Sequence, residues 1–174
     1  MKNLLLIILI LIANPEKNEK PEIDEIRRMF FTMDREQCGT LLLFRAIESD
    51  SYSDPLLQAY AGATEAASAE CVDGAFNKLE SFSRGKNNLE DAVERDPQNP
   101  EIRFLRFATQ VNLPNFITYD NIRDDKTLIL NRLPQLLGGK SNEDFWVRVA
   151  EFMAATNALN KNEKKRVEQL LQTN

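Results

Sequence analysis

The residue types that usually carry out chemistry in proteins are sparse in this chain of 174 residues. It contains no histidine, which excludes a Ser-His-Asp triad, a Cys-His pair and histidine ligands for zinc or haem. Cys38 and Cys71 are the only cysteines, and two thiols alone cannot complete a cysteine zinc site. The segment GGKS at 138–141 lacks the upstream glycine of a phosphate-binding loop, so we expect it to end one helix and start another.

Carboxylates are the remaining catalytic candidates, chiefly Glu90 with Glu94 one helical turn later, and the adjacent Asp124 and Asp125. A hydrolase that works through two carboxylates needs them facing each other across a cleft, one of them in apolar surroundings. No such pair is marked here, and helix faces exposed to water account for these residues. We predict a protein without catalysis, cofactor or metal. A carboxylate-dependent hydrolase remains an alternative, which a deep cleft with two facing acids would support.

Two arginines form the cluster most suited to binding a ligand. Arg103 and Arg106 are three residues apart, so both point from one face of a helix. Two guanidinium groups on one face can hold a carboxylate or phosphate by paired hydrogen bonds. The alternative is that they pair with carboxylates of the following segment and tie neighbouring helices together. The candidate residues for binding a partner or anion are Arg103, Arg106, Tyr60 and Tyr119, and the candidate carboxylates of the alternative are Asp120, Asp124 and Asp125.

Composition and charge point to one soluble domain. Apolar residues make up 43% and charged residues 28% of the chain, and its net charge is −5 with both signs interspersed. No basic stripe alternates with aromatic residues, so nucleic-acid binding is excluded. Glycine is scarce, with 6 residues, and hairpin signals such as Asn-Gly do not recur, which favours helices over sheets.

The N-terminus carries a signal for export. A short start containing Lys2 is followed by the apolar run Leu4–Ile12, Ala13 and a polar stretch with prolines. This order is typical of a secretory signal peptide, and the apolar run is shorter than the roughly 20 residues of a membrane span. We predict a signal peptide at 1–13, a linker at 14–21 and one helical domain at 22–174, in the periplasm or secreted. The alternative is a cytoplasmic protein in which Leu4–Ile12 forms a buried helix.

The two cysteines leave a choice open. In an exported protein, an even number of cysteines permits a disulfide, here with one possible pairing. The alternative is two free thiols that act as small core residues. The sequence does not give the separation of the Cα atoms on which the bond depends.

Apolar residues recur at helical spacing through almost the whole chain, which predicts about eight helices joined by short connections. Asp54-Pro55 has the residue types of a helix N-cap followed by the first helical residue. Pro134, with the glycines that follow it, is expected to stop a long helix. Trp146, Phe145 and Phe152 are expected in the core. The first three predicted helices lie at 23–33, 41–47 and 56–71. A loop at 72–74 leads through Phe76, Leu79 and Phe82 into the fourth, which ends at 95. The others lie at 101–113, within 116–133 after a turn, at 143–159 and at 164–172.

The most informative stretch is GKNNLEDAVERDPQNPEIRFLRFATQ, from Gly85 to Gln110. It predicts a helix ending at Arg95, a tight corner at 96–100 and a second helix from Glu101, so that the two helices pack side by side. Ala92 stands five residues before Pro97, and a bulky leucine precedes Ala92 by three.

This half-motif resembles the second helix of a tetratricopeptide-type repeat. The resemblance covers Asp54 to about Gln110, requires an insertion between Gly74 and Arg84, and shows no second copy. Together with the apolar N-terminus, the stretch is also similar to exported helical proteins of Bacteroidetes-type bacteria. These resemblances imply an all-α fold, a right-handed stack of antiparallel helix pairs whose concave face binds partners.

The predicted function is a protein- or peptide-binding scaffold that is exported. A groove, if present, is expected on the side of Tyr60 and the Arg103–Arg106 pair. The alternative function is a receptor for a small acidic ligand or anion held by Arg103 and Arg106. Neither the partner nor the oligomeric state follows from the sequence.

Overall fold

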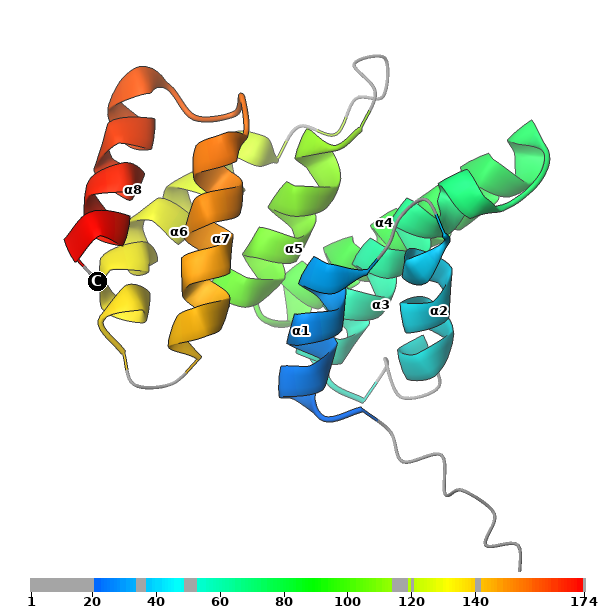
Figure 1. Ribbon diagram of the computed structural model, residues 1–174. Coiled ribbons are helices and arrows are strands. Elements are labelled where there is room, and N and C mark those ends of the chain that lie inside the picture. Colours follow the sequence, from blue (N-terminus) through cyan, green and yellow to red (C-terminus); the bar gives the residue numbers. More distant parts are fainter. Residues whose placement is uncertain are drawn as a thin grey trace, which may run out of the picture.

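The computed structural model describes residues 21–33, 37–48, 53–113, 119, 121–139 and 142–173. Within these ranges the chain forms eight α-helices, one short 3₁₀ helix and no strand, which confirms the predicted all-α class (Figure 1). The elements are α1 (Ile23–Thr32), α2 (Gly39–Ile47), α3 (Pro55–Ser68), η2 (Ala69–Cys71), α4 (Ala75–Arg95), α5 (Pro100–Val111), α6 (Ile122–Leu137), α7 (Glu143–Ala155) and α8 (Lys161–Thr173). The predicted signal peptide at 1–13 and all but the last residue of the predicted linker lie outside the described residues.

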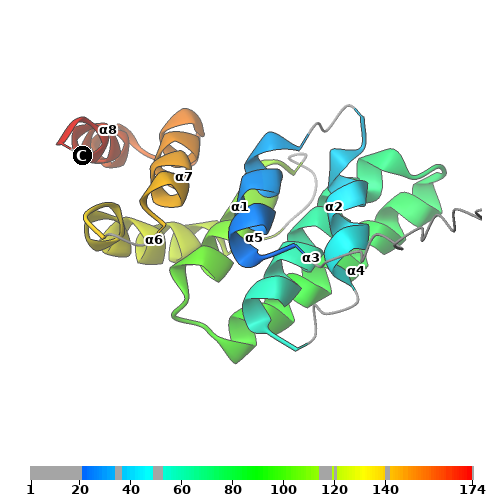
Figure 2. The same cartoon turned by 60° about the horizontal axis from the view of Figure 1, so that its bottom comes forward.

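Successive helices pack against one another along the molecule. α3 lies along α4, α2 packs on α3, and α5 contacts both α3 and α6, while α7 packs on α8 and α6. The helices therefore extend from α2, α3 and α4 at one end to α7 and α8 at the other, with α1 between α2 and α7 (Figures 1 and 2). The tip of the α3–α4 hairpin projects from the first of these ends.

Local capping chemistry accounts for the helix starts that the sequence predicts. Asp54 accepts hydrogen bonds from the backbone N–H groups of Leu56 (2.7 Å) and Leu57 (3.1 Å), and proline is the first residue of α3. The 96–100 corner is confirmed as well: α4 ends at Arg95 and α5 begins at Pro100. There the Asn99 side chain accepts hydrogen bonds from the backbone N–H groups of Glu101 and Ile102.

Several predicted helix boundaries are wrong. α6 runs through Pro134 to Leu137, because a proline in the last turn removes only one hydrogen bond from the helix. α7 ends at Ala155 rather than at residue 159, in a turn where the Thr156 hydroxyl bonds the Met153 carbonyl. α8 begins three residues earlier than predicted. Asn160 caps two N–H groups and Glu163 accepts from the Asn160 N–H, which together form a capping box. Residues 140 and 141 of the GGKS segment lie outside the described residues.

The tightest contact in the fold joins α3 to α4 at two glycines. A Cβ atom on Gly85 would lie 2.3 Å from the Ala66 nitrogen and 2.5 Å from the Gly62 oxygen. A Cβ on Gly62 would lie 2.7 Å from the Gly85 oxygen. The two helix backbones therefore touch directly, which only glycine permits at these positions. Polar side chains secure the contact at its side, where Glu65 accepts from the Arg84 guanidinium at 2.7 Å.

A buried polar cluster joins α1, α3 and α5. The guanidinium of Arg27 donates two hydrogen bonds to the carboxylate of Glu101, at 2.8 and 2.7 Å, and the hydroxyl of Tyr60 donates to the same carboxylate at 2.7 Å. Phe30 packs edge-on against the Tyr60 ring, with centroids 5.5 Å apart. These contacts hold the short α1 helix on the rest of the core.

Of the two alternatives for the cysteines, a disulfide or two free thiols, the structure contains the disulfide. Cys38 and Cys71 form a disulfide, with Cα atoms 5.7 Å apart. It joins the residue before α2 to the last residue of η2. The start of α2 is thereby fixed to the tip of the α3–α4 hairpin.

Replacing Gly85 by alanine is expected to destabilise the fold by more than about 3 kcal/mol. Overpacking a core usually costs less than this, but both obstructing neighbours here are backbone atoms that cannot rotate away. Gly138→Ala is the matched control, because its Cβ would meet the nearest atom at 3.5 Å and its free energy of unfolding should change little. Chemical denaturation of both variants measures the difference. Equal stability of the two variants would contradict the backbone contact.

Removing the disulfide by the double substitution Cys38→Ser and Cys71→Ser is expected to lower the free energy of unfolding. The bond closes a loop with a sequence separation of 33, for which the chain-entropy relation gives about 3–4 kcal/mol. Thermal unfolding with and without reductant tests this. Reductant should lower the midpoint of the unsubstituted chain and leave that of the double variant unchanged. A midpoint insensitive to reductant in both chains would show that the bond is absent.

Candidate binding site

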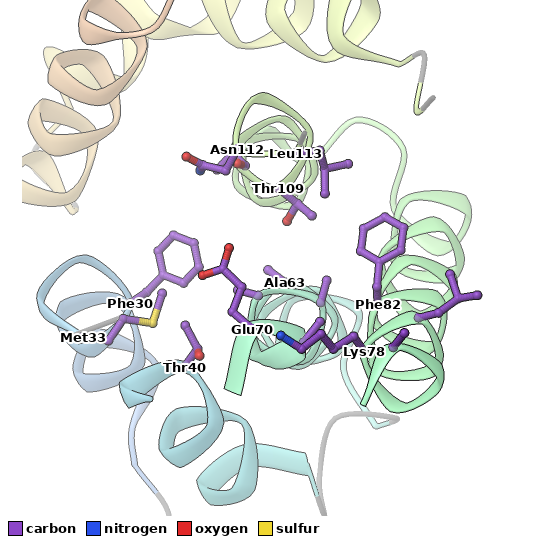
Figure 3. Close-up of a pocket in the computed structure, with 16 residues that line it drawn as sticks. Phe30, Met33, Thr40, Ala63, Glu70, Lys78, Phe82, Thr109, Asn112 and Leu113 are labelled. Carbon is purple, nitrogen blue, oxygen red and sulfur yellow. The ribbon is translucent and has the colours of Figure 1, made fainter. Parts of the chain in front are cut away.

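An open apolar groove of about 470 Å³ lies where α1, α2, α3, α4 and α5 meet (Figure 3). Its size is within the range of ligand-binding pockets in proteins. The residues that line it are Phe30, Met33, Thr40, Ala63, Ala66, Ala67, Ala69, Glu70, Ala75, Lys78, Leu79, Phe82, Ala108, Thr109, Asn112 and Leu113. We call this surface the apolar groove.

The groove has small side chains at its base and bulky side chains at its sides. Its floor is α3, whose side chains here are alanines such as Ala63. Phe30 stands on the α1 side and Phe82 on the α4 side, with α5 across the groove from α3 (Figure 3). The cavity therefore results from small side chains on one helix enclosed by bulky ones on its neighbours.

The α4 wall continues outside the groove as an exposed apolar surface. Phe76 is 77% exposed and Leu79 is 63% exposed, and the two are three residues apart on one side of the helix. Leu79 lines the groove, whereas Phe76 lies beyond its lining. We call these two residues the α4 ridge. Large apolar side chains held in water next to an apolar cavity are typical of an interaction surface.

The groove also contains polar groups that lack partners. The hydroxyl of Thr40 is buried, with the residue 2% exposed, and makes no hydrogen bond within the described residues. Glu70 and Lys78 are the two ionisable side chains of the lining, and no described residue pairs with either of them. By contrast, Thr109 and Asn112 bond carbonyl oxygens of their own helix. The groove therefore offers a bound molecule one hydroxyl group and two side chains of opposite charge.

The arginine pair lies elsewhere and is already engaged. Arg106 donates two hydrogen bonds to Asp125, at 2.9 and 2.8 Å, and a third to Glu90. Arg103 forms an ion pair with the same aspartate at 2.6 Å. Burial raises the pKa of Asp125, while the hydrogen bonds and charge of Arg106 act to lower it. The arginines therefore join α5 to α6 and α4, as the alternative interpretation expects, and the carboxylates of Asp125 and Glu90 already engage the Arg106 guanidinium.

The two candidate tyrosines are also buried. Tyr60 is 0% exposed and donates its hydroxyl to Glu101, and burial together with that carboxylate raises the pKa of Tyr60 well above its usual value. Tyr119 is 7% exposed, with the Lys86 ammonium 4.8 Å from its ring centroid. The expectation of a groove on the side of Tyr60 and the arginine pair is therefore wrong. The apolar groove is bordered by a different face of α5, through Thr109 and Asn112.

The aromatic residues of α7 belong to the core, as predicted. Phe145 and Trp146 are buried, and Phe152 packs against the same core from α7. Among the described residues, no three acidic or cysteine side chains come close enough to hold a metal ion. In the same part of the chain, no helix has the length and apolar character needed to cross a membrane.

No protein-family model, curated protein or solved structure matches this chain. Function must therefore be argued from the geometry of the chain itself. The groove residues were not singled out from the sequence, although one signal was there. Ala75, Leu79 and Phe82 repeat at helical spacing within the stretch that the repeat resemblance cannot accommodate.

Replacing Arg106 by methionine is expected to destabilise the fold by about 3–5 kcal/mol, because it leaves the fully buried Asp125 carboxylate without its principal partner. The double variant Arg106→Met and Asp125→Leu should lose less than the single variant, since it removes both charges. Arg123→Met, on the exposed side of α6, is the control and should be close to neutral. Urea unfolding measures all three. A fully stable Arg106→Met variant would restore the arginine pair as a ligand site.

Proposed function

We propose that this chain is an exported, disulfide-bonded helical scaffold without catalytic activity, which binds a partner polypeptide through the apolar groove. The observation that carries the proposal is the continuity of the groove with the α4 ridge. A cavity lined by alanines and bordered by exposed Phe76 and Leu79 offers a partner both a recess and a projecting edge.

A polypeptide fits this surface better than a small ligand does. A small molecule that fills the cavity leaves Phe76 in water, because this side chain lies outside the lining. A helix laid across the groove can cover the cavity and the α4 ridge together, as in other proteins that bind an apolar helix face in a groove. Covering a large apolar side chain stabilises the bound state by about 1.5–3 kcal/mol. The ridge therefore favours an occupant longer than the cavity.

Two features support export. Disulfides persist in oxidising compartments, and the Cys38–Cys71 bond joins the groove's α2 side to its η2 side. The apolar run at 4–12 predicts a signal peptide that would deliver the chain to such a compartment. Stacking of the tetratricopeptide type is part of the same proposal, supported by the α4–α5 corner and by the packing of consecutive helices.

Site-specific photo-crosslinking tests the function. A photoreactive amino acid at position 79, at the edge of the groove, should give a polypeptide adduct in cells that export the protein. The same amino acid at position 151, exposed on α7 and outside the groove lining, is the control and should not give that adduct. Mass spectrometry of the crosslinked peptide should map it to an apolar helical segment, and the purified segment should reproduce the adduct. Crosslinks at position 79 to lipid or solvent alone would contradict a polypeptide partner.

A further inference from the structure

Two opposite charges without partners lie on the groove surface. Glu70 is in η2, Lys78 is one turn into α4, and both side chains extend over the groove (Figure 3). Both are exposed, and no ion pair joins them to each other or to another described residue. Elsewhere in the described chain, Arg27, Arg84, Arg103 and Arg106 all have carboxylate partners. Glu70 and Lys78 are thus the two charges of the groove lining, and the single copy leaves both unmatched.

The recess and the projecting side chains of this surface also have nothing packed against them within one copy. It places a floor of alanines beside the α4 ridge, so a recess and a projection of similar chemistry lie next to each other. In a two-fold dimer the same patch meets itself, so a ridge of one copy placed in the recess of the other implies the reverse contact at the same time. In such a dimer the same contact between ridge and recess forms twice, once on each side of the axis.

We infer that the occupant of the apolar groove is a second copy of this chain. In this symmetric dimer the start of α4 of each copy lies across the groove of the other. Glu70 of each copy then faces Lys78 of its partner, so the dimer contains the same ion pair twice. This inference rests on the proposed function, because it names the polypeptide that the groove binds.

Charge complementarity favours a second copy over an unrelated helix. An unrelated partner must supply a base opposite Glu70 and an acid opposite Lys78 at the correct spacing. A second copy supplies both by symmetry, together with the bulky Phe76 and Leu79 that match the alanine floor. Stable interfaces bury about 800 Å² per partner, so neighbouring parts of α2 and η2 are expected to contribute as well.

Charge reversal tests this symmetry directly. Sedimentation velocity of the disulfide-bonded chain, from about 1 µM to about 1 mM, should show a reversible dimer. Glu70→Lys alone and Lys78→Glu alone should each weaken the dimer by at least about tenfold, because each creates two like-charge contacts. An equimolar mixture of the two variants should restore a dimer that contains one copy of each. The double variant, with both reversals in one chain, should restore it as well.

Matched controls separate these effects from net charge and from folding. Glu168→Lys and Lys165→Glu make the same changes of charge on exposed positions of α8, and neither should alter the dimer. All variants should keep the thermal midpoint of the unsubstituted monomer at low concentration, because Glu70 and Lys78 make no contact that the monomer requires. Single reversals without effect, or a mixture that stays monomeric, would overturn the symmetric pairing.

The crosslink at position 79 distinguishes failure of this inference from failure of the proposed function. An adduct between two copies supports both. A chain that stays monomeric to the highest concentration, and crosslinks through position 79 to a helix of another protein, overturns the dimer and supports the binding function. A monomer without any polypeptide adduct overturns both.

Discussion

The direct contact between Gly62 and Gly85 is the constraint on which the rest of the structure depends. It brings two backbones together without any side chain between them, so the separation and crossing of α3 and α4 have little freedom. Beside this contact, the α3 residues that line the groove are alanines, and they form its floor. The same contact fixes the position of α4, which forms a wall. The groove is therefore bounded by two helices whose separation this contact sets.

Buried charges then position the other helices around this pair. Glu101 receives hydrogen bonds from Arg27 and from Tyr60, and so holds α1 and α5 on α3. Asp125, with Arg103 and Arg106, holds α6 on α5. Buried ion pairs add little net stability compared with apolar packing, but each requires one particular partner, so we infer that they fix the register of the helices. Phe30 reaches the groove only because α1 is held in this register.

The sequence predicts what is local and fails where the partner is distant. Asp54-Pro55 and the 96–100 corner define helix boundaries because the capping atoms lie within three residues of one another. The glycine contact is not readable from the sequence, since Gly62 and Gly85 are 23 positions apart and each alone only weakens a helix. Arg106 suggests an anion site until Asp125 is placed beside it by the packing of α5 on α6. Tyr60 suggests a surface role until it is found in the core.

The α4 side of the groove comes from the stretch that the proposed tetratricopeptide-type spacing does not accommodate. The spacing of a tetratricopeptide-type repeat requires an insertion between Gly74 and Arg84, and the structure shows these residues as the first turns of a continuous α4. They lie beyond the glycine contact, so the core of the single copy does not require large apolar side chains there. Phe76 and Leu79 are nevertheless large, apolar and mostly exposed. Folding of one copy gains little from these side chains in water, whereas the proposed polypeptide partner would gain their burial, so their exposure supports the proposed binding function.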